Sequence, residues 1–415
     1  MSGSFNVCFF ARFEDGTMWV VRIPLEPVVE DSWIKIQSEV ATMRYIKLKT
    51  TIPIPRVHAY GQSTQLTKSG GSATFMICDF ILGQRLQFDK VDNATEERRT
   101  RFLDELIDIL VQLRRLEFPT AGSLMPNPVD DSEPIVGGFL GMAMNELQRD
   151  TGKKKNLVSF SSAEAFMDHQ YSILSEYYAV PMANLQQPSI EEHLFVLDSL
   201  AEQIPQLLDP QWSNGPFVLS HLDLRCSNII VDQDLHILAI IDWEFSGTVP
   251  LQYFTPPLWI TGEGRSGGFL SFQDAILRSF EAVLQAKSAT SESCAQLVRE
   301  WNWNNKPKLM FPIVQILREP DTLARVYRRH LCHRFYEGSL KEVVSDFFAH
   351  QKRAKRLKPL VSRRLEASKR YTEYLIDHDL LFIDQDEERR EAERVALIKE
   401  GMAKLGIGKL TSTSS

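Results

Sequence analysis

The first part of the chain alternates short apolar runs with turn residues, a pattern typical of β-strands. Residues 5–23 hold two runs rich in Val, Phe and Ile, separated by Glu14, Asp15 and Gly16, which predicts a hairpin. Apolar positions then recur with helical spacing over residues 31–47. We expect a helix there, with Asp31 or Ser32 as its N-cap.

A second pair of strand-like segments follows this helix. Residues 52–61 predict an extended segment, because each proline disfavours helix at the residue before it. The polar stretch from Thr64 to Ser72 predicts a turn, and residues 73–81 predict a buried strand that ends before Gly83. The N-terminal part is therefore expected to be a small sheet with one helix.

Helical periodicity dominates the chain after this sheet. Asn93 with Glu96 resembles a capping box and would open a helix through about Leu116. Strands are expected to return over residues 214–245. Further helices are expected at 162–178, 189–208, 271–287, 292–301, 320–354 and 361–377.

This order of elements predicts an α+β protein with two lobes, a small β-rich lobe followed by a larger, mainly helical lobe. We place the first lobe at residues 1–85 and the second at 86–385. Residues 386–415 are expected to form a charged helix at 386–404 and a disordered tail.

Composition narrows the class of protein. The 415 residues are 43% hydrophobic and 24% charged, with a formal net charge of -7, which is ordinary for a soluble enzyme and argues against non-specific nucleic-acid binding. No apolar run reaches the length of a membrane span, and no signal peptide is expected. The scattered cysteines lack a C-x-x-C pair and favour a reducing, cytoplasmic location. They are Cys8, Cys78, Cys226, Cys294 and Cys332.

Residues 215–247 carry the candidate chemistry. A polar loop, His221 to Asn228, precedes a short apolar hairpin that ends at Asp242. A stiff hairpin with polar groups at both ends would hold Asp223, Asn228 and Asp242 close together on rigid supports. Each of the three alone reads as a turn or cap residue, and only the constellation favours a site.

These residue types suit phosphoryl transfer from a magnesium-bound nucleotide. Magnesium prefers oxygen ligands and takes one or two from the protein, which Asn228 and Asp242 would supply. Asp223 would orient the acceptor hydroxyl and receive its proton. His221 is expected to support the loop through hydrogen bonds, and Cys226 to pack rather than to act as a nucleophile.

The pattern His221-x-Asp223-x-x-x-x-Asn228, followed by Asp242 fourteen residues on, resembles the motifs of aminoglycoside phosphotransferase-like kinases. Trp243 and Glu244 after Asp242 favour the small-molecule branch of that fold over protein kinases. Segments 137–147 and 256–260 look like fungal members of the group. The resemblance implies a protein-kinase-like fold, ATP and Mg²⁺ as cofactors, and transfer of the γ-phosphoryl group to an alcohol group of a hydroxylated small molecule.

The resemblance also implies a nucleotide-clamping role for the first lobe. The strand residue that pairs with the phosphates falls on Arg22, and its partner on the following helix falls on Glu39. Kinases generally carry lysine at the strand position. Arginine keeps the charge but presents a planar fork.

Two further nucleotide contacts follow from family order alone. Gly3 and Ser4 resemble the end of the glycine-containing loop over the phosphates, and the strand expected before them is missing from the sequence. Residues from Asp79 to Ile81 would form the hinge that meets the adenine.

Other functions compete with this hypothesis. An impaired kinase-like binding scaffold, a pseudokinase, is favoured by the missing strand and opposed by the intact set of three oxygen-bearing residues. A protein kinase is disfavoured because DFG and APE-like segments are absent. A metallo-hydrolase using His221, Asp223 and Asp242 lacks additional histidine ligands. The acceptor stays open among an aminoglycoside, a sugar, choline and a fungal metabolite, as does the oligomeric state, and no nucleic-acid or membrane partner is expected.

Overall fold

The computed structural model describes residues 5–66, 71–130, 132–261, 270–301 and 307–381. The chain divides into two compact units. One holds Met1–Val180 and Glu191–Lys355, and the other holds Pro181–Ile190 and the chain from Arg356 onward. The lobe boundary predicted at residue 85 lies within the first unit and stays a prediction. Gly3, Ser4 and the predicted helix and tail at 386–415 lie outside the described residues.

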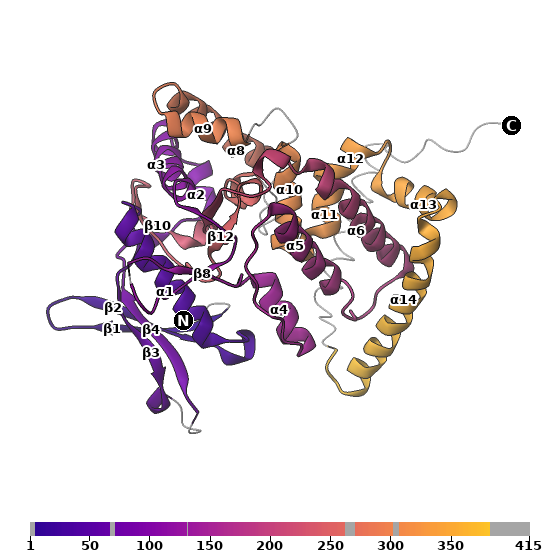
Figure 1. Cartoon of the computed structure of the whole chain (residues 1–415), viewed down its shortest axis with the longest axis horizontal. Coiled ribbons are helices and arrows are strands. Elements are labelled where there is room, and N and C mark those ends of the chain that lie inside the picture. The colour runs from indigo at the N-terminus through magenta and orange to yellow at the C-terminus, as the bar shows by residue number, and fades with distance from the viewer. Residues whose placement is uncertain (1–4, 67–70, 131, 262–269, 302–306, 382–415) are drawn as a thin grey trace, which may run out of the picture. The chain divides into compact units, whose positions relative to one another are not determined.

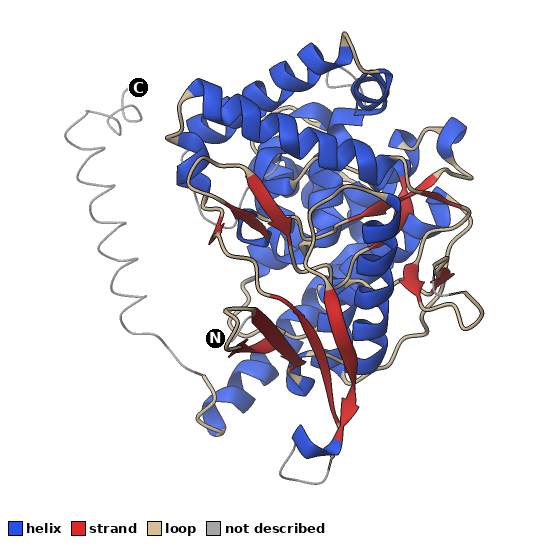
Figure 2. Ribbon diagram, turned by 90° about the vertical axis from the view of Figure 1, so that its left-hand side faces the viewer, coloured by secondary structure: helices blue, strands red, loops and turns tan. Residues whose placement is uncertain are grey.

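An antiparallel sheet of four strands, in the order β1-β2-β4-β3, begins the first unit. The strands are β1 (Asn6–Arg12), β2 (Met18–Pro24), β3 (Val57–Ser63) and β4 (Ala73–Asp79). The predicted hairpin is confirmed, because Asn6 pairs with Pro24 and Arg12 pairs with Met18. Figure 2 shows the long strands of this sheet grouped together, apart from the shorter strands that follow in the chain.

Helix α1 (Ser32–Lys49) contacts this sheet (Figure 1). Its N-cap is Asp31 rather than Ser32, since Asp31 Oδ1 accepts a hydrogen bond of 2.9 Å from Ile34 N. The helix buries apolar residues such as Ile36 and Ile46. It also buries Lys35 and Glu39, which apolar spacing does not predict.

Helices make up most of the remaining described chain (Figure 1). They are α2 (Phe88–Asp92), α3 (Glu96–Arg114), α4 (Met142–Thr151), α5 (Ala163–Tyr177), α6 (Gln187–Leu207), α7 (Leu258–Thr261), α8 (Leu270–Ser288), α9 (Glu292–Trp301), α10 (Pro307–Arg318), α11 (Leu323–Val326), α12 (Cys332–Phe335), α13 (Leu340–His350) and α14 (Ala354–Asp377). Among the described residues, no helix combines the length and the apolar character that crossing a bilayer needs. The predicted α+β class, with a sheet first and helices after it, is confirmed.

Two helix predictions are wrong in their details. Asn93 does not open the helix at Glu96, because its Nδ2 donates to Asp89 O at 2.8 Å and closes α2. Thr95 caps α3 instead, through its bond from Arg98 N. The single helix expected at 320–354 is broken into several pieces, and Gly338, with a φ of 92°, lies at the break between α12 and α13.

Short strands carry the chemistry-bearing segment. The predicted hairpin is confirmed as β10 (Ile229–Val231) and β11 (Ile237–Ile240), with Ile229 opposite Ile240. The other short strands are β5 (Gln84–Arg85), β6 (Glu117–Phe118), β7 (Ser123–Met125), β8 (Ile135–Gly137), β9 (Phe217–Ser220) and β12 (Gly247–Pro250). β9 lies between β6 and β12, and β5 extends the hairpin at β10.

Candidate active site

The loop from His221 to Asn228 leaves the buried strand β9 and is held by the His221 ring. Asp223 N donates to His221 Nδ1 at 3.3 Å, so Nε2 carries the proton and donates to Ile241 O at 3.0 Å. Burial lowers the pKa of His221, which keeps the ring neutral. The ring therefore links the loop to the end of β11.

Asp223 and Asn228 contact each other within this loop. Asn228 Nδ2 donates to Asp223 O at 2.8 Å and to Asp223 Oδ2 at 3.3 Å. Arg225 Nε forms an ion pair with Asp223 Oδ1. Burial raises the pKa of Asp223 to about 6, although the neighbouring Arg225 opposes the shift.

Asp242 follows β11 at the open end of the hairpin, the same end at which Asn228 precedes β10. Ile241 N donates to Asn228 O at 2.9 Å, which joins the two strands at this end. Asp242 has a φ of 67°, an uncommon conformation for a residue with a side chain. Burial opposes its ionisation, but Arg22 and Lys35 outweigh burial and lower the pKa of Asp242. The structure thus brings together the three oxygen-bearing residues that the sequence singled out.

Arg22 connects the N-terminal sheet to this hairpin. It lies on β2, and its Nη1 forms an ion pair with Glu39 on α1. Its Nη2 lies 2.6 Å from Asp242 Oδ1 and 3.4 Å from Glu244 Oε2. One guanidinium therefore contacts three carboxylates from two segments of the chain, α1 and the residues that follow β11.

Lys35 and Asn6 complete this network and were not predicted from the sequence. Lys35 Nζ forms an ion pair with Glu244 Oε2, which also accepts a 2.9 Å hydrogen bond from Asn6 Nδ2. Lys35 is only 2% exposed. The signal that could have found it is its spacing, since it precedes Glu39 by four residues and so shares its helix face.

Arg225 was also missed. The sequence places it two residues after Asp223, but the ion pair between them depends on the conformation of the loop.

The side chain of Asp79 lies against β3. Its Oδ1 is 2.7 Å from His58 Nε2, and its Oδ2 accepts a bond of 3.0 Å from Arg56 N. Ile81 is half-buried in the connection that follows β4. The adenine-binding role of these two residues stays a prediction. Their backbone groups would make the contact with the adenine.

The remaining predicted residues are buried around the hairpin. Trp243 has no exposed surface, and its Nε1 donates to Ile240 O at 3.0 Å.

Burial raises the pKa of Cys226 to about 12, so its thiol stays protonated and unsuited to attack. All five cysteines lie in the described residues, and none of them forms a disulfide. In the described part of the chain, no group of three or more His, Cys, Asp or Glu side chains could hold a metal ion.

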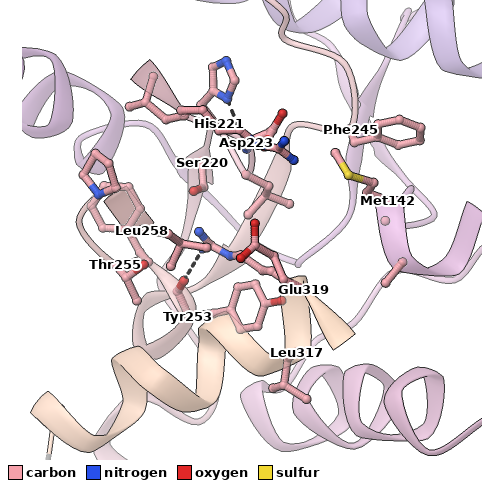
Figure 3. A pocket seen from close by; sticks show the side chains of 18 of the residues that line it. Met142, Ser220, His221, Asp223, Phe245, Tyr253, Thr255, Leu258, Leu317 and Glu319 are labelled. Atoms are coloured by element: carbon pink, nitrogen blue, oxygen red, sulfur yellow. Dashed lines mark hydrogen bonds and ion pairs between the residues drawn. The ribbon is translucent and has the colours of Figure 1, made fainter. Parts of the chain in front are cut away.

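A cavity of about 70 Å³ adjoins the loop on the side of Asp223 (Figure 3). Most of its wall is apolar, with side chains such as Met142, Phe245 and Leu258. Polar groups gather near the loop, where Asp223 and Glu319 both line the cavity. The site therefore combines a carboxylate of raised pKa with an adjoining, mainly apolar cavity.

A sequence profile described as the phosphotransferase enzyme family (APH) matches residues 6–253. The match covers more than half of the chain. It includes Arg22, Glu39, the loop from His221 to Asn228, and Asp242.

Curated relatives are fungal. A clavilactone A biosynthesis cluster protein of Ampulloclitocybe clavipes is 26% identical, over 59% of this chain and 59% of its own length. A subtelomeric hrmA-associated cluster protein of Aspergillus fumigatus is 24% identical, over 60% of this chain and 57% of its own. The chain thus matches less than two thirds of the length of these relatives.

Solved structures that match this chain include two kinases. An ethanolamine kinase of Plasmodium vivax is 12% identical, with a TM-score of 0.43, over 85% of this chain and 80% of its own. An amicoumacin kinase is also 12% identical, with a TM-score of 0.42, over 84% and 85%.

Proposed function

Because the chain belongs to the phosphotransferase enzyme family, we propose that it is a small-molecule kinase that transfers the γ-phosphoryl group of ATP to a hydroxyl group. The observation that carries this proposal is the convergence of Asp223, Asn228 and Asp242 at the open end of one hairpin, where Arg22 reaches Asp242 from the sheet. Phosphoryl transfer depends mainly on positioning and on neutralising charge, and this arrangement supplies both.

Asp223 is the proposed general base. A base works best when its pKa lies close to the working pH, and burial raises the pKa of Asp223 to about 6. Its carboxylate would accept the proton of the acceptor hydroxyl as the oxygen attacks. Arg225 would keep the carboxylate oriented, since it is paired with Asp223 Oδ1.

Asn228 and Asp242 fit a magnesium ion. The Asn228 amide nitrogen is directed to Asp223, so its carbonyl oxygen is the atom that would bind a cation. Asp242 adds a carboxylate whose side chain is 31% exposed and whose pKa is lowered. One or two protein oxygens suffice for magnesium in nucleotide sites. When bound, the ion would neutralise charge on the phosphates.

Arg22 is the proposed phosphate-binding residue of the sheet. Glu39 orients its guanidinium from α1, as an acidic helix partner would. We keep Gly3 and Ser4 as proposed phosphate contacts, and Asp79 and Ile81 as the proposed adenine hinge.

The acceptor is proposed to be a fungal metabolite. The names of the relatives refer to gene clusters, and one of them to the biosynthesis of clavilactone A. The five cysteines form no disulfide, which supports a reducing compartment such as the cytoplasm.

A second candidate is a nucleotide-binding scaffold without turnover. The observation that favours it is that Arg22 pairs with Asp242 while Arg225 pairs with Asp223. Both carboxylates needed for the chemistry are engaged by arginines of the chain itself.

One experiment separates the two candidates. ATP consumption would be screened against a panel of hydroxylated metabolites, with Asp223→Ala as the test variant and Asp234→Ala, in the exposed turn of the same hairpin, as its control. A kinase loses turnover in the first variant only. Thermal stabilisation by Mg-ATP without turnover on any acceptor would favour the scaffold, and turnover that survives Asp223→Ala would refute the assignment of the base.

A further inference from the structure

Arg318 lines the cavity beside Asp223 and has few partners for its charge. It is the last residue of α10, and its Nη2 donates to Tyr253 O at 2.7 Å. Its guanidinium carbon lies 4.8 Å from the centre of the Tyr253 ring. An arginine carries five N–H donors, so one backbone carbonyl leaves most of them unmatched.

The same wall contains further polar atoms without partners. Within the described residues, Arg318 Nε, Thr255 Oγ1 and Trp259 Nε1 are buried and have no hydrogen-bond partner. All three groups can donate, and buried donors without partners are rare in folded proteins. These atoms are enclosed in the wall, so a ligand would reach them once the side chains turn toward the cavity.

Two carboxylates, Asp223 and Glu319, line the cavity with Arg318, but neither forms a direct ion pair with it. Burial lowers the pKa of Arg318 even though Tyr253, Glu319 and Asp223 act in the opposite direction. Glu319 is engaged elsewhere, since its Oε2 accepts a bond from Gln315 Nε2 at 3.3 Å and it has a further partner. Asp223 is paired with Arg225.

We propose that Arg318, with Thr255 and Trp259, binds the carboxylate of the phosphoryl acceptor, and that the acceptor is a small hydroxy acid with an apolar body. The proposal rests on the function proposed above. A carboxylate offers several acceptor lone pairs and matches the fork of an arginine. The apolar remainder of the wall suits a hydrocarbon body, and a cavity of about 70 Å³ suits a small one.

The reaction balances without another reactant. The acceptor hydroxyl oxygen forms a bond to the γ-phosphorus of ATP, and the bond from that phosphorus to the bridging oxygen breaks. The proton of the hydroxyl passes to Asp223, and ADP leaves. The carboxylate of the acceptor stays on Arg318 and takes no part in the transfer.

The test compares acids with their uncharged amides on the full chain. Lactate, mandelate and hydroxybutyrate would each be paired with the corresponding amide, and binding by calorimetry and ADP release would be measured with Mg-ATP. We expect at least one acid to bind about 10- to 100-fold more tightly than its amide, because a charged hydrogen bond is lost in the amide. If no acid at about 10 mM binds better than its amide, the proposal is overturned.

Variants then assign the preference to Arg318. Arg318→Met should remove the preference for the acid and leave binding of the amide unchanged, Arg318→Lys should retain part of it, and the exposed Arg334→Met should have no effect. Equal losses for acid and amide would show that Arg318 only ties α10 to Tyr253. If Arg318→Met does not fold, the difference in affinity between acid and amide in the unmodified protein tests the proposal.

Failure of the kinase function gives a different result. Acids would then bind better than amides, in a manner that depends on Arg318, while no ADP is released with any acid. That outcome supports the carboxylate site and refutes the proposed reaction.

Discussion

Arg22 and Asp242 lie 220 residues apart in the sequence, and their Nη2 and Oδ1 atoms lie 2.6 Å apart in the structure. The proposed phosphate-binding cation is thus paired with the proposed magnesium ligand. The same guanidinium holds Glu39 and approaches Glu244. Arg22 therefore has a structural role besides its proposed role toward the nucleotide.

Arg22→Met is expected to destabilise the protein. The variant leaves three carboxylates near each other with only Lys35 to compensate them, and breaking a buried ion pair costs about 3–5 kcal/mol. Urea unfolding would measure the loss, with Arg12→Met, at an exposed position of β1, as the control. Equal stability of the two variants would contradict the structural role of Arg22.

Asp242→Ala is expected to weaken Mg-ATP binding more than Asn228→Ala does. The first change removes a full charge and the second removes a neutral oxygen, and hydrogen bonds or ligand contacts to charged groups are about twice as strong. Titration calorimetry at several magnesium concentrations would compare the two. Equal losses of affinity would refute this ranking.

Asp223→Asn should abolish turnover and make the folded protein more stable at neutral pH. The native pKa of Asp223 is raised from 3.8 to about 6, so its favourable contribution exists at low pH and disappears as the pH rises through 6. The shift corresponds to about 3 kcal/mol at most. The asparagine variant should therefore gain stability relative to the native protein between about pH 4 and pH 7.

Unfolding curves measured across this range would test that sign. A stability difference that is flat with pH would mean that Asp223 ionises as it does in the unfolded chain. In the kinase assay, kcat/KM should fall as the pH drops below about 6, because the base must be unprotonated.

Lys35→Met should destabilise the protein through Glu244. Both side chains are buried. The variant leaves the Glu244 carboxylate with two other contacts, a hydrogen bond from Asn6 Nδ2 and Arg22 Nη2 at 3.4 Å. We expect a loss of about 3–5 kcal/mol. Glu244→Gln in the same background should recover part of this loss, because it removes the stranded charge.

A double-mutant cycle on Lys35 and Glu244 would measure this coupling. Additive effects of the two changes would show that the pair does not interact. Lys47→Met, on the exposed part of α1, is the matched control and should be close to neutral.

The sequence by itself determined the local part of the candidate site. The spacing of Asp223, Asn228 and Asp242 around two short apolar runs was sufficient to predict the hairpin that holds them. A hairpin is a short-range structure, because its strands are adjacent in the chain and its turn fixes their register. The first hairpin of the sheet was predictable for the same reason.

Only the tertiary structure decided which charges meet. Lys35 and Asn6 contact Glu244 across more than 200 residues, and Arg318 reaches the cavity from a helix that periodicity did not predict. Thr95 is the N-cap of α3, because Asn93 already caps the C-terminus of α2. Such contacts depend on how separate elements pack. A buried charge pairs with the partner that packing brings within reach, and the local sequence pattern does not predict which partner that is.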